Sequence, residues 1–157
     1  MATDITGIWD FIWTGDPETM KQHVLTPVSI PDFPTQRVCF VSVGGDRYRG
    51  RFYDPELPQR SYPNWPWDST FDVQVLSSST PGQEYDAVSM IVSFRSSEDV
   101  PAYDAYEAIA GQVRTDYPGE PAPIMFGLVY GNNGDFAVWK MTKNVSLGGC
   151  PDSLFQG

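Results

Sequence analysis

Short runs of β-branched and aromatic residues recur along the chain and predict several β-strands. The clearest pair is RVCFVSV at 37–43 and RYRGRFY at 47–53, and the Gly44-Gly45-Asp46 sequence between them is typical of a hairpin turn. The predicted strands are residues 37–43, 47–53, 70–76, 87–94, 124–130 and 136–141. Hairpins at 37–53 and 124–141 place antiparallel pairs in the sheet.

Two further segments carry helix signals. Residues 16–25 begin with Asp16 as a candidate N-cap and Pro17 at the first helical position. Residues 102–115 place apolar side chains at helical spacing, namely Ala102, Tyr106, Ile109 and Val113. Strands combined with these helices predict an α+β (or α/β) fold: one domain over residues 1–157, with a mixed sheet and an irregular tail from about residue 142.

Length and charge bound the class of protein. The chain has 157 residues, with 20 acidic against 10 basic side chains and a formal net charge of −10. This length predicts a single domain, and the acid excess argues against a general nucleic-acid-binding protein, which needs a basic surface. The sequence contains no zinc spacing, phosphate-binding loop or dinucleotide fingerprint, so we expect neither a metal nor a cofactor.

Location is constrained by apolar runs and by cysteine use. No apolar run approaches the roughly 18 residues of a membrane span, and MATDITGIWDF lacks the basic region of a signal peptide. We therefore expect a soluble, cytoplasmic or otherwise intracellular protein without membrane contact. Cys39 lies within an apolar run and is interpreted as a buried thiol; a bridge to Cys150 stays open, although two cysteines fall short of a disulfide framework.

The second half of the chain carries a family resemblance. From Thr70 onward the predicted order is strand, strand, helix, strand and hairpin strand, with Phe71-Asp72 in the first strand and Ser93-Phe94-Arg95 at the end of the second. Over about residues 70–141 this order resembles the core of restriction-endonuclease-like domains, the PD-(D/E)XK superfamily. The resemblance implies that Asp72 matches the metal-binding aspartate of that family and that Ser93-Phe94-Arg95 matches its acid-x-Lys triplet.

The same residues depart from the family where its chemistry needs them most. Ser93 supplies a neutral hydroxyl where a hard cation requires a carboxylate, and Arg95 cannot release a proton at neutral pH. The single carboxylate of Asp72 is too little for metal-assisted phosphodiester cleavage. The resemblance therefore implies a nuclease-like scaffold that is catalytically degenerate.

An alternative fold comes from the first residues. Gly7-Ile8-Trp9 is similar to the opening of lipocalins and implies a calycin or lipocalin-like barrel with a ligand cavity. The predicted helix at 102–115, flanked by strands, departs from an up-and-down barrel of that kind.

Two clusters are candidate binding surfaces. The first is an arginine at every second position of 47–53, which on a strand forms either a solvated face paired with acids or a site for a carboxylate or phosphate. The second is a proline-rich aromatic segment around residues 62–71, which forms either an exposed stacking surface or a buried lid. The candidate ligand-binding residues are Arg47, Arg49, Arg51, Trp65, Trp67, Asp72 and Arg95.

Two functions compete on this basis. The first is a non-enzymatic binding or accessory protein that engages a protein partner, and a flat exposed apolar patch would favour it. The second is a binding protein or enzyme for a small anionic or aromatic ligand, in which the aromatic segment closes a pocket over Arg49, Arg51 and Asp72. Self-association into a homodimer is also expected if residues 37–43 or 136–141 form an uncovered edge strand.

Overall fold

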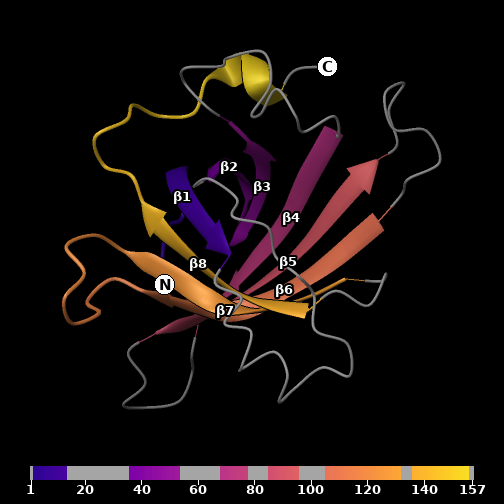
Figure 1. Cartoon of the computed structure of the whole chain (residues 1–157). Coiled ribbons are helices and arrows are strands. Elements are labelled where there is room, and N and C mark those ends of the chain that lie inside the picture. The colour runs from indigo at the N-terminus through magenta and orange to yellow at the C-terminus, as the bar shows by residue number, and fades with distance from the viewer. Residues whose placement is uncertain are drawn as a thin grey trace.

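The structure, a computed structural model, describes residues 2–13, 36–53, 68–77, 85–95, 105–131 and 136–155. Within these residues eight antiparallel strands form one closed barrel (Figure 1). The strands are β1 (Gly7–Trp13), β2 (Gln36–Gly44), β3 (Arg47–Phe52), β4 (Asp68–Leu76), β5 (Asp86–Arg95), β6 (Ala105–Arg114), β7 (Ile124–Gly131) and β8 (Phe136–Lys143). A short 3₁₀ helix, η1 (Asp152–Phe155), follows the last strand.

The barrel has an up-and-down topology. Each strand pairs with the next one in the chain, and β8 returns to pair with β1, with Trp9 opposite Lys143 and Phe11 opposite Met141. Closure leaves every described strand with two hydrogen-bonded neighbours, so the uncovered edges from which self-association was expected are absent from this barrel. No helix among the described residues has the length and apolar character needed to cross a membrane.

The α+β fold with a mixed sheet was therefore wrong, and the barrel alternative describes the architecture. The predicted helix at 102–115 is strand β6 over most of its length, so the element order behind the nuclease-like fold does not exist. All six predicted strands are confirmed, with boundaries shifted by at most two residues, but β1 was missed. The predicted helix at 16–25 lies outside the described residues.

The spacing of apolar residues in β6 explains the error. Ile109 and Val113 are four residues apart, so they share a face on a helix and also on a strand. In the barrel both point inward and are almost fully buried. Alanine is the strongest helix former, but helix propensities differ by less than about 1 kcal/mol per residue, and pairing with β5 on one side and β7 on the other outweighs that preference.

Glycine is required where β6 meets β7. Gly111 and Gly127 are cross-strand partners on the inward face. A Cβ atom on Gly111 would lie 2.1 Å from the Phe126 carbonyl oxygen and 2.9 Å from the Trp139 ring, and one on Gly127 would lie 2.0 Å from the Ala110 oxygen. Only glycine permits this close approach, which leaves room for the Trp139 indole inside the barrel.

Large apolar side chains fill the interior. The largest of those with less than 2% exposure are Trp9, Trp139, Phe11, Phe40, Phe71, Ile5, Met90, Ile109, Met125 and Met141. Phe71 meets Phe40 and Phe52 in edge-to-face contacts, with ring centroids 6.0 and 5.1 Å apart. Each such side chain contributes about 1.5–3 kcal/mol on burial, and eight strands enclose a space that side chains alone can fill.

The N-terminal segment (residues 2–6) crosses one end of the barrel. The Thr3 backbone N–H and hydroxyl donate to Asp86 at the start of β5, with distances of 2.6 and 2.8 Å. In a ring of eight strands β5 lies opposite β1, which the segment enters directly, so residues 2–6 span the opening. Ile5 is fully buried, and its carbonyl accepts a hydrogen bond from the Trp9 indole. This end of the barrel is closed by the chain itself.

The C-terminal segment (residues 144–155) lies against the outside of β1 and β2. A disulfide joins Cys150 to Cys39, with the Cα atoms 5.7 Å apart, so the interpretation of Cys39 as a free buried thiol was wrong. Cys39 alternates with the inward Val38 and Phe40 and therefore points out of the barrel. The Asn144 N–H also donates to the Ile8 carbonyl on β1. The bridge and this hydrogen bond fix the segment to the outer wall.

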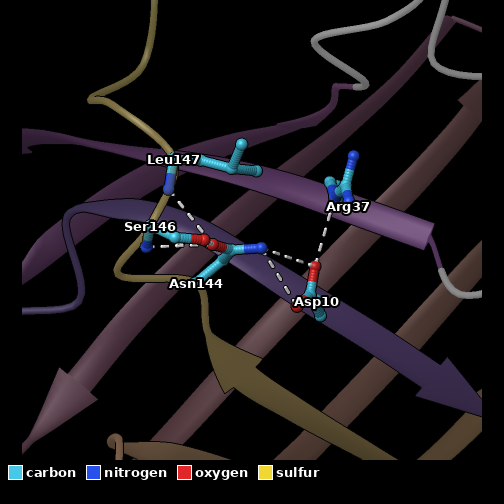
Figure 2. Close-up of polar contacts among 5 residues, drawn as sticks. All are labelled: Asp10, Arg37, Asn144, Ser146 and Leu147. Carbon is cyan, nitrogen blue, oxygen red and sulfur yellow. Dashed lines mark hydrogen bonds and ion pairs between the residues drawn. The ribbon is translucent and has the colours of Figure 1, made fainter.

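A polar network holds the start of this segment (Figure 2). The Asn144 side-chain oxygen accepts hydrogen bonds from the Ser146 N–H and hydroxyl and from the Leu147 N–H, while its amide nitrogen donates to both Asp10 oxygens. Asp10 in turn accepts from Arg37 Nε at 3.3 Å. Asp10 and Arg37 are cross-strand partners on β1 and β2, so one asparagine ties the segment to two strands.

Candidate binding surface

The predicted arginine face exists, and it lies on the outside of the barrel. Along β3 the inward positions Tyr48, Gly50 and Phe52 are buried, as strict alternation requires. Arg47 and Arg49 on the opposite face are exposed, and Arg51 is half-buried beside Cys39, its cross-strand partner on β2. The arginines therefore face away from the apolar interior.

Acidic and polar residues stand next to this face. Arg49 is the cross-strand partner of the exposed Asp72 on β4, and Arg47 is the partner of Gln74. Opposite charges in directly opposed positions stabilise a sheet by a fraction of a kcal/mol, which fits a solvated wall. The structure thus brings together four of the predicted residues, Arg47, Arg49, Arg51 and Asp72, on one outer surface.

The remaining predicted residues are not placed with them. Arg95 ends β5 opposite Asp68 in register, and its side chain lies outside the described part of the structure. Trp65 and Trp67 also lie outside the described residues, so the choice between an exposed platform and a buried lid stays a prediction.

A different surface, which the sequence reasoning missed, covers the outside of β5, β6 and β7 and extends to Leu76 at the end of β4. Four large apolar residues here are strongly exposed, and small uncharged residues fill the space between them. The exposed fractions are 47% for Leu76, 45% for Ile91, 38% for Leu128 and 52% for Tyr130. We call this surface the apolar wall and define it as Leu76, Ala87, Ser89, Ile91, Ala108, Ala110, Leu128 and Tyr130.

Strand register makes the apolar wall continuous. Ala108 on β6 lies between Ile91 on β5 and Tyr130 on β7, which gives one row across three strands. The next row is Ser89, Ala110 and Leu128, and Leu76 on β4 lies opposite Ala87 on β5. The signal in the sequence was the absence of charge at alternate positions of AVSMIVSF and of AIAGQ, which was obscured when 102–115 was interpreted as a helix.

A cation stands beyond one end of the apolar wall. Arg114 is the last residue of β6, and its guanidinium carbon lies 5.2 Å from the centre of the Tyr85 ring and 5.1 Å from that of Tyr117. The Tyr117 ring also meets Phe126 edge-to-face, with centroids 5.7 Å apart. Cation–π contacts at these distances are favourable and hold the guanidinium group in place.

Among the described residues, the groups with a shifted pKa lie elsewhere, at the end closed by residues 2–6. Hydrogen bonds from the Thr6 hydroxyl and N–H, at 2.6 and 2.9 Å, lower the pKa of the Asp4 carboxyl. Burial, and then the nearby charge of Asp4, raise the pKa of the Tyr48 hydroxyl, which lies 3.5 Å from an Asp4 oxygen. Both groups serve to hold the N-terminal segment.

Within the described parts of the chain, no three His, Cys, Asp or Glu side chains come together as a metal site would require. Comparisons with protein-family models, with curated proteins and with solved structures found no match to this chain.

Proposed function

We propose that this protein is a non-enzymatic binding protein that engages a protein partner through the apolar wall. The observation that carries this proposal is the exposure of Leu76, Ile91, Leu128 and Tyr130 together on one side of a barrel whose described inward side chains form a buried apolar core. Apolar side chains scattered singly over a protein surface are common, whereas a contiguous exposed apolar patch usually marks an interaction site.

The size of the apolar wall indicates how it would be used. A stable protein–protein interface buries about 800 Å² on each partner, and an apolar patch of a few hundred square ångströms supplies only its centre. The residues around the wall are suited to a polar rim, since Gln74, Gln112 and Lys140 occupy outward positions on β4, β6 and β8. This arrangement, an apolar centre with a polar rim, is common in protein interfaces.

The packed interior argues against the alternative of a deep small-molecule pocket. Phe71 on β4 and Trp139 on β8 point inward from opposite sides of the barrel. Both side chains are almost completely buried. A pocket over Arg49, Arg51 and Asp72 would have to form outside the barrel, because these residues point away from its axis. Small-ligand binding therefore remains the second candidate, on the outer surface that carries Arg49, Arg51 and Asp72.

The disulfide bears on where the protein acts. A Cys39–Cys150 bridge persists in oxidising surroundings and is rare in the reducing cytoplasm. We accordingly favour an oxidising compartment over the cytoplasmic location expected from the sequence. Reducing and non-reducing electrophoresis of alkylated protein from its source would test this directly, since free thiols at both positions in the native protein would contradict it.

Position-specific photo-crosslinking tests the proposed surface. A photoreactive amino acid is placed at Leu128 in the apolar wall and, as a matched control, at Val43, which is 54% exposed on the β2–β3 hairpin. We expect one defined protein adduct from Leu128, identified by mass spectrometry, and none from Val43. Equal labelling from both positions, or no adduct from Leu128 in the native setting, would overturn the proposal.

A further inference from the structure

Arg114 occupies a defined place relative to the apolar wall. Val113 points into the barrel and is almost fully buried, so Arg114, the next residue, points outward on the same side as Ala110 and Gln112. Arg114 lies four residue steps along the strand from Ala110, which is about 13 Å on the barrel surface. A partner seated on the apolar wall would therefore reach the guanidinium group within the length of a short peptide.

The two tyrosines restrict how this guanidinium group can be approached. Tyr85 comes just before β5 and Tyr117 lies in the connection between β6 and β7, so the rings reach Arg114 from different elements. A ring that faces the guanidinium plane attracts its charge but offers no in-plane acceptor for its N–H groups. The N–H donors at its edge are thus left to other acceptors.

Those donors have no acceptor within the described residues. Arg114 Nε is shielded from solvent and makes no hydrogen bond there, and no ion pair links Arg114 to a described carboxylate. Among the neighbouring acids, Glu120 is paired with Lys140 and Asp86 accepts from Thr3, while the exposed Asp116 makes no ion pair with Arg114 in the described structure. The chain has twice as many acidic as basic side chains, and Arg37 is paired with Asp10. Arg114 differs from Arg37 because it is half-buried without a described carboxylate partner.

We propose that Arg114, positioned by Tyr85 and Tyr117, binds a carboxylate that the partner presents beside its apolar docking segment. A guanidinium group held by aromatic rings offers two parallel N–H donors through Nη1 and Nη2, and this fork matches the two oxygens of a carboxylate. The Tyr117 ring is itself supported by its edge-to-face contact with Phe126, which limits the positions that the guanidinium group can take. The matching ligand is an apolar segment with one neighbouring carboxylate, from an acidic side chain or a chain terminus.

A single carboxylate is also what the overall charge allows. With a net charge of −10, the chain repels a strongly acidic partner at distances up to the Debye length of about 8 Å. A single carboxylate adds little to this repulsion. Its attraction to Arg114 acts at short range and can outweigh it. This inference rests on the proposed function for the identity of the partner, whereas the anion site itself can be tested alone.

The test uses small probes and the arginine side-chain signals in NMR. N-acetyl-leucinate, its neutral amide and inorganic phosphate are titrated separately into protein labelled with ¹⁵N at arginine, and the Arg114 Nε–Hε signal is followed. We expect a saturable shift with the carboxylate, and binding of the amide weaker by about tenfold or more, because hydrogen bonds to a charged group are lost. Equal shifts from carboxylate and amide, or tighter binding of phosphate, would overturn the assignment.

Variants separate the site from its surroundings. R114Q has no Arg114 side-chain signal, so its titration is followed at the backbone amides of Val113 and Thr115 in uniformly ¹⁵N-labelled protein, where the carboxylate response of the parent should be lost. Y117L, which keeps the charge but removes one ring, should weaken the Arg114 response; R47Q, on the exposed face of β3, is the matched control and should leave it unchanged. A carboxylate response that survives in R114Q would refute the inference. Should R114Q fail to fold, unchanged affinity in Y117L would refute the role of the aromatic rings in positioning the arginine.

The failures of the two proposals are distinguishable. If the Leu128 photo-adduct forms unchanged in R114Q, the apolar wall binds a partner without the carboxylate contact, and this inference fails alone. If N-acetyl-leucinate shifts the Arg114 signal but Leu128 yields no adduct, the anion site stands and the proposed function fails.

Discussion

Two parts of the outer surface of the barrel differ in how far their apolar side chains are covered. On β1 and β2 the outward residues Ile8 and Cys39 are covered by the C-terminal segment and are almost fully buried. On β5 to β7 the outward residues Ile91 and Leu128 remain 45% and 38% exposed. Both walls carry apolar side chains, but only one of them is covered by the described chain.

Outward apolar side chains are therefore not exposed everywhere on this barrel; their exposure is a feature of the wall formed by β5 to β7. The chain covers its first wall with a disulfide, the Asn144 network and a backbone hydrogen bond to Ile8 (Figure 2). The apolar wall stays exposed to solvent, which lowers the solubility of the protein. The proposed partner would cover this surface. The following predictions test this contrast, starting with the largest expected effect.

Replacing Gly127 should damage the support beneath the apolar wall. A Cβ atom there would meet the Ala110 oxygen at 2.0 Å, which forces β6 and β7 apart. We expect G127A to lower the free energy of unfolding by about 4 kcal/mol or more, or to prevent folding, because the opposing atom is backbone and cannot give way. Urea denaturation measures the change.

G148A is the matched control, since a Cβ atom on Gly148 would meet nothing within 4 Å. Its unfolding free energy should stay within about 0.5 kcal/mol of the parent. A G127A variant as stable as G148A would show that the strands do not approach as closely as described here.

Removing the disulfide should release the cover of the first wall. Cys39 and Cys150 are 111 residues apart, so the bridge restricts a large part of the unfolded chain. We expect the double variant C39S/C150S to lose about 3 kcal/mol of stability and to gain hydrogen exchange at Ile8 and along residues 144–155. A loss below about 0.5 kcal/mol with unchanged exchange would mean that the segment holds its place without the bridge.

A matched pair of isoleucines sharpens the contrast between the walls. Ile8 is 3% exposed and Ile91 is 45% exposed, and both point out of the barrel. We expect I8A to cost about 2 kcal/mol of stability and I91A less than about 0.5 kcal/mol. Equal losses in thermal or urea unfolding would show that both walls are buried to a similar degree in solution.

The parts of this fold that were predicted correctly are those with local signals. Strict alternation in β3 revealed both its strand character and the outward direction of Arg47 and Arg49. The Gly44-Gly45 turn was equally clear, since both residues have a positive φ that favours glycine. In β6, by contrast, the four-residue spacing from Ile109 to Val113 fits two periods, and only pairing with β5 and β7 decides between them.

The candidate sites depended on contacts between distant residues. Nothing local to Cys39 reveals that Cys150 binds it, or that Arg114 lies against both Tyr85 and Tyr117. The apolar wall was likewise invisible, because its rows join residues from four separate strands. Closure of the barrel, a property of the whole chain, creates all three arrangements.

The smallest expected effect concerns the N-terminal segment at the closed end. The pKa of Asp4 is lowered in the folded state by its hydrogen bonds with Thr6, so its ionised form stabilises the fold above the unfolded pKa. That stability is lost as the pH falls through the lowered folded pKa. We expect D4N, which retains an acceptor oxygen for Thr6, to flatten this acid limb slightly; an unchanged limb would contradict the assignment.

The apolar wall is proposed to bind a partner, and its exposed side chains are not expected to stabilise the fold. The most direct measurement combines I91K with the photoreactive residue at Leu128, and records both the protein adduct and the free energy of unfolding. We expect I91K to remove the adduct while the unfolding free energy stays within about 0.5 kcal/mol of the parent. An adduct that persists in I91K, or a loss of several kcal/mol, would contradict it.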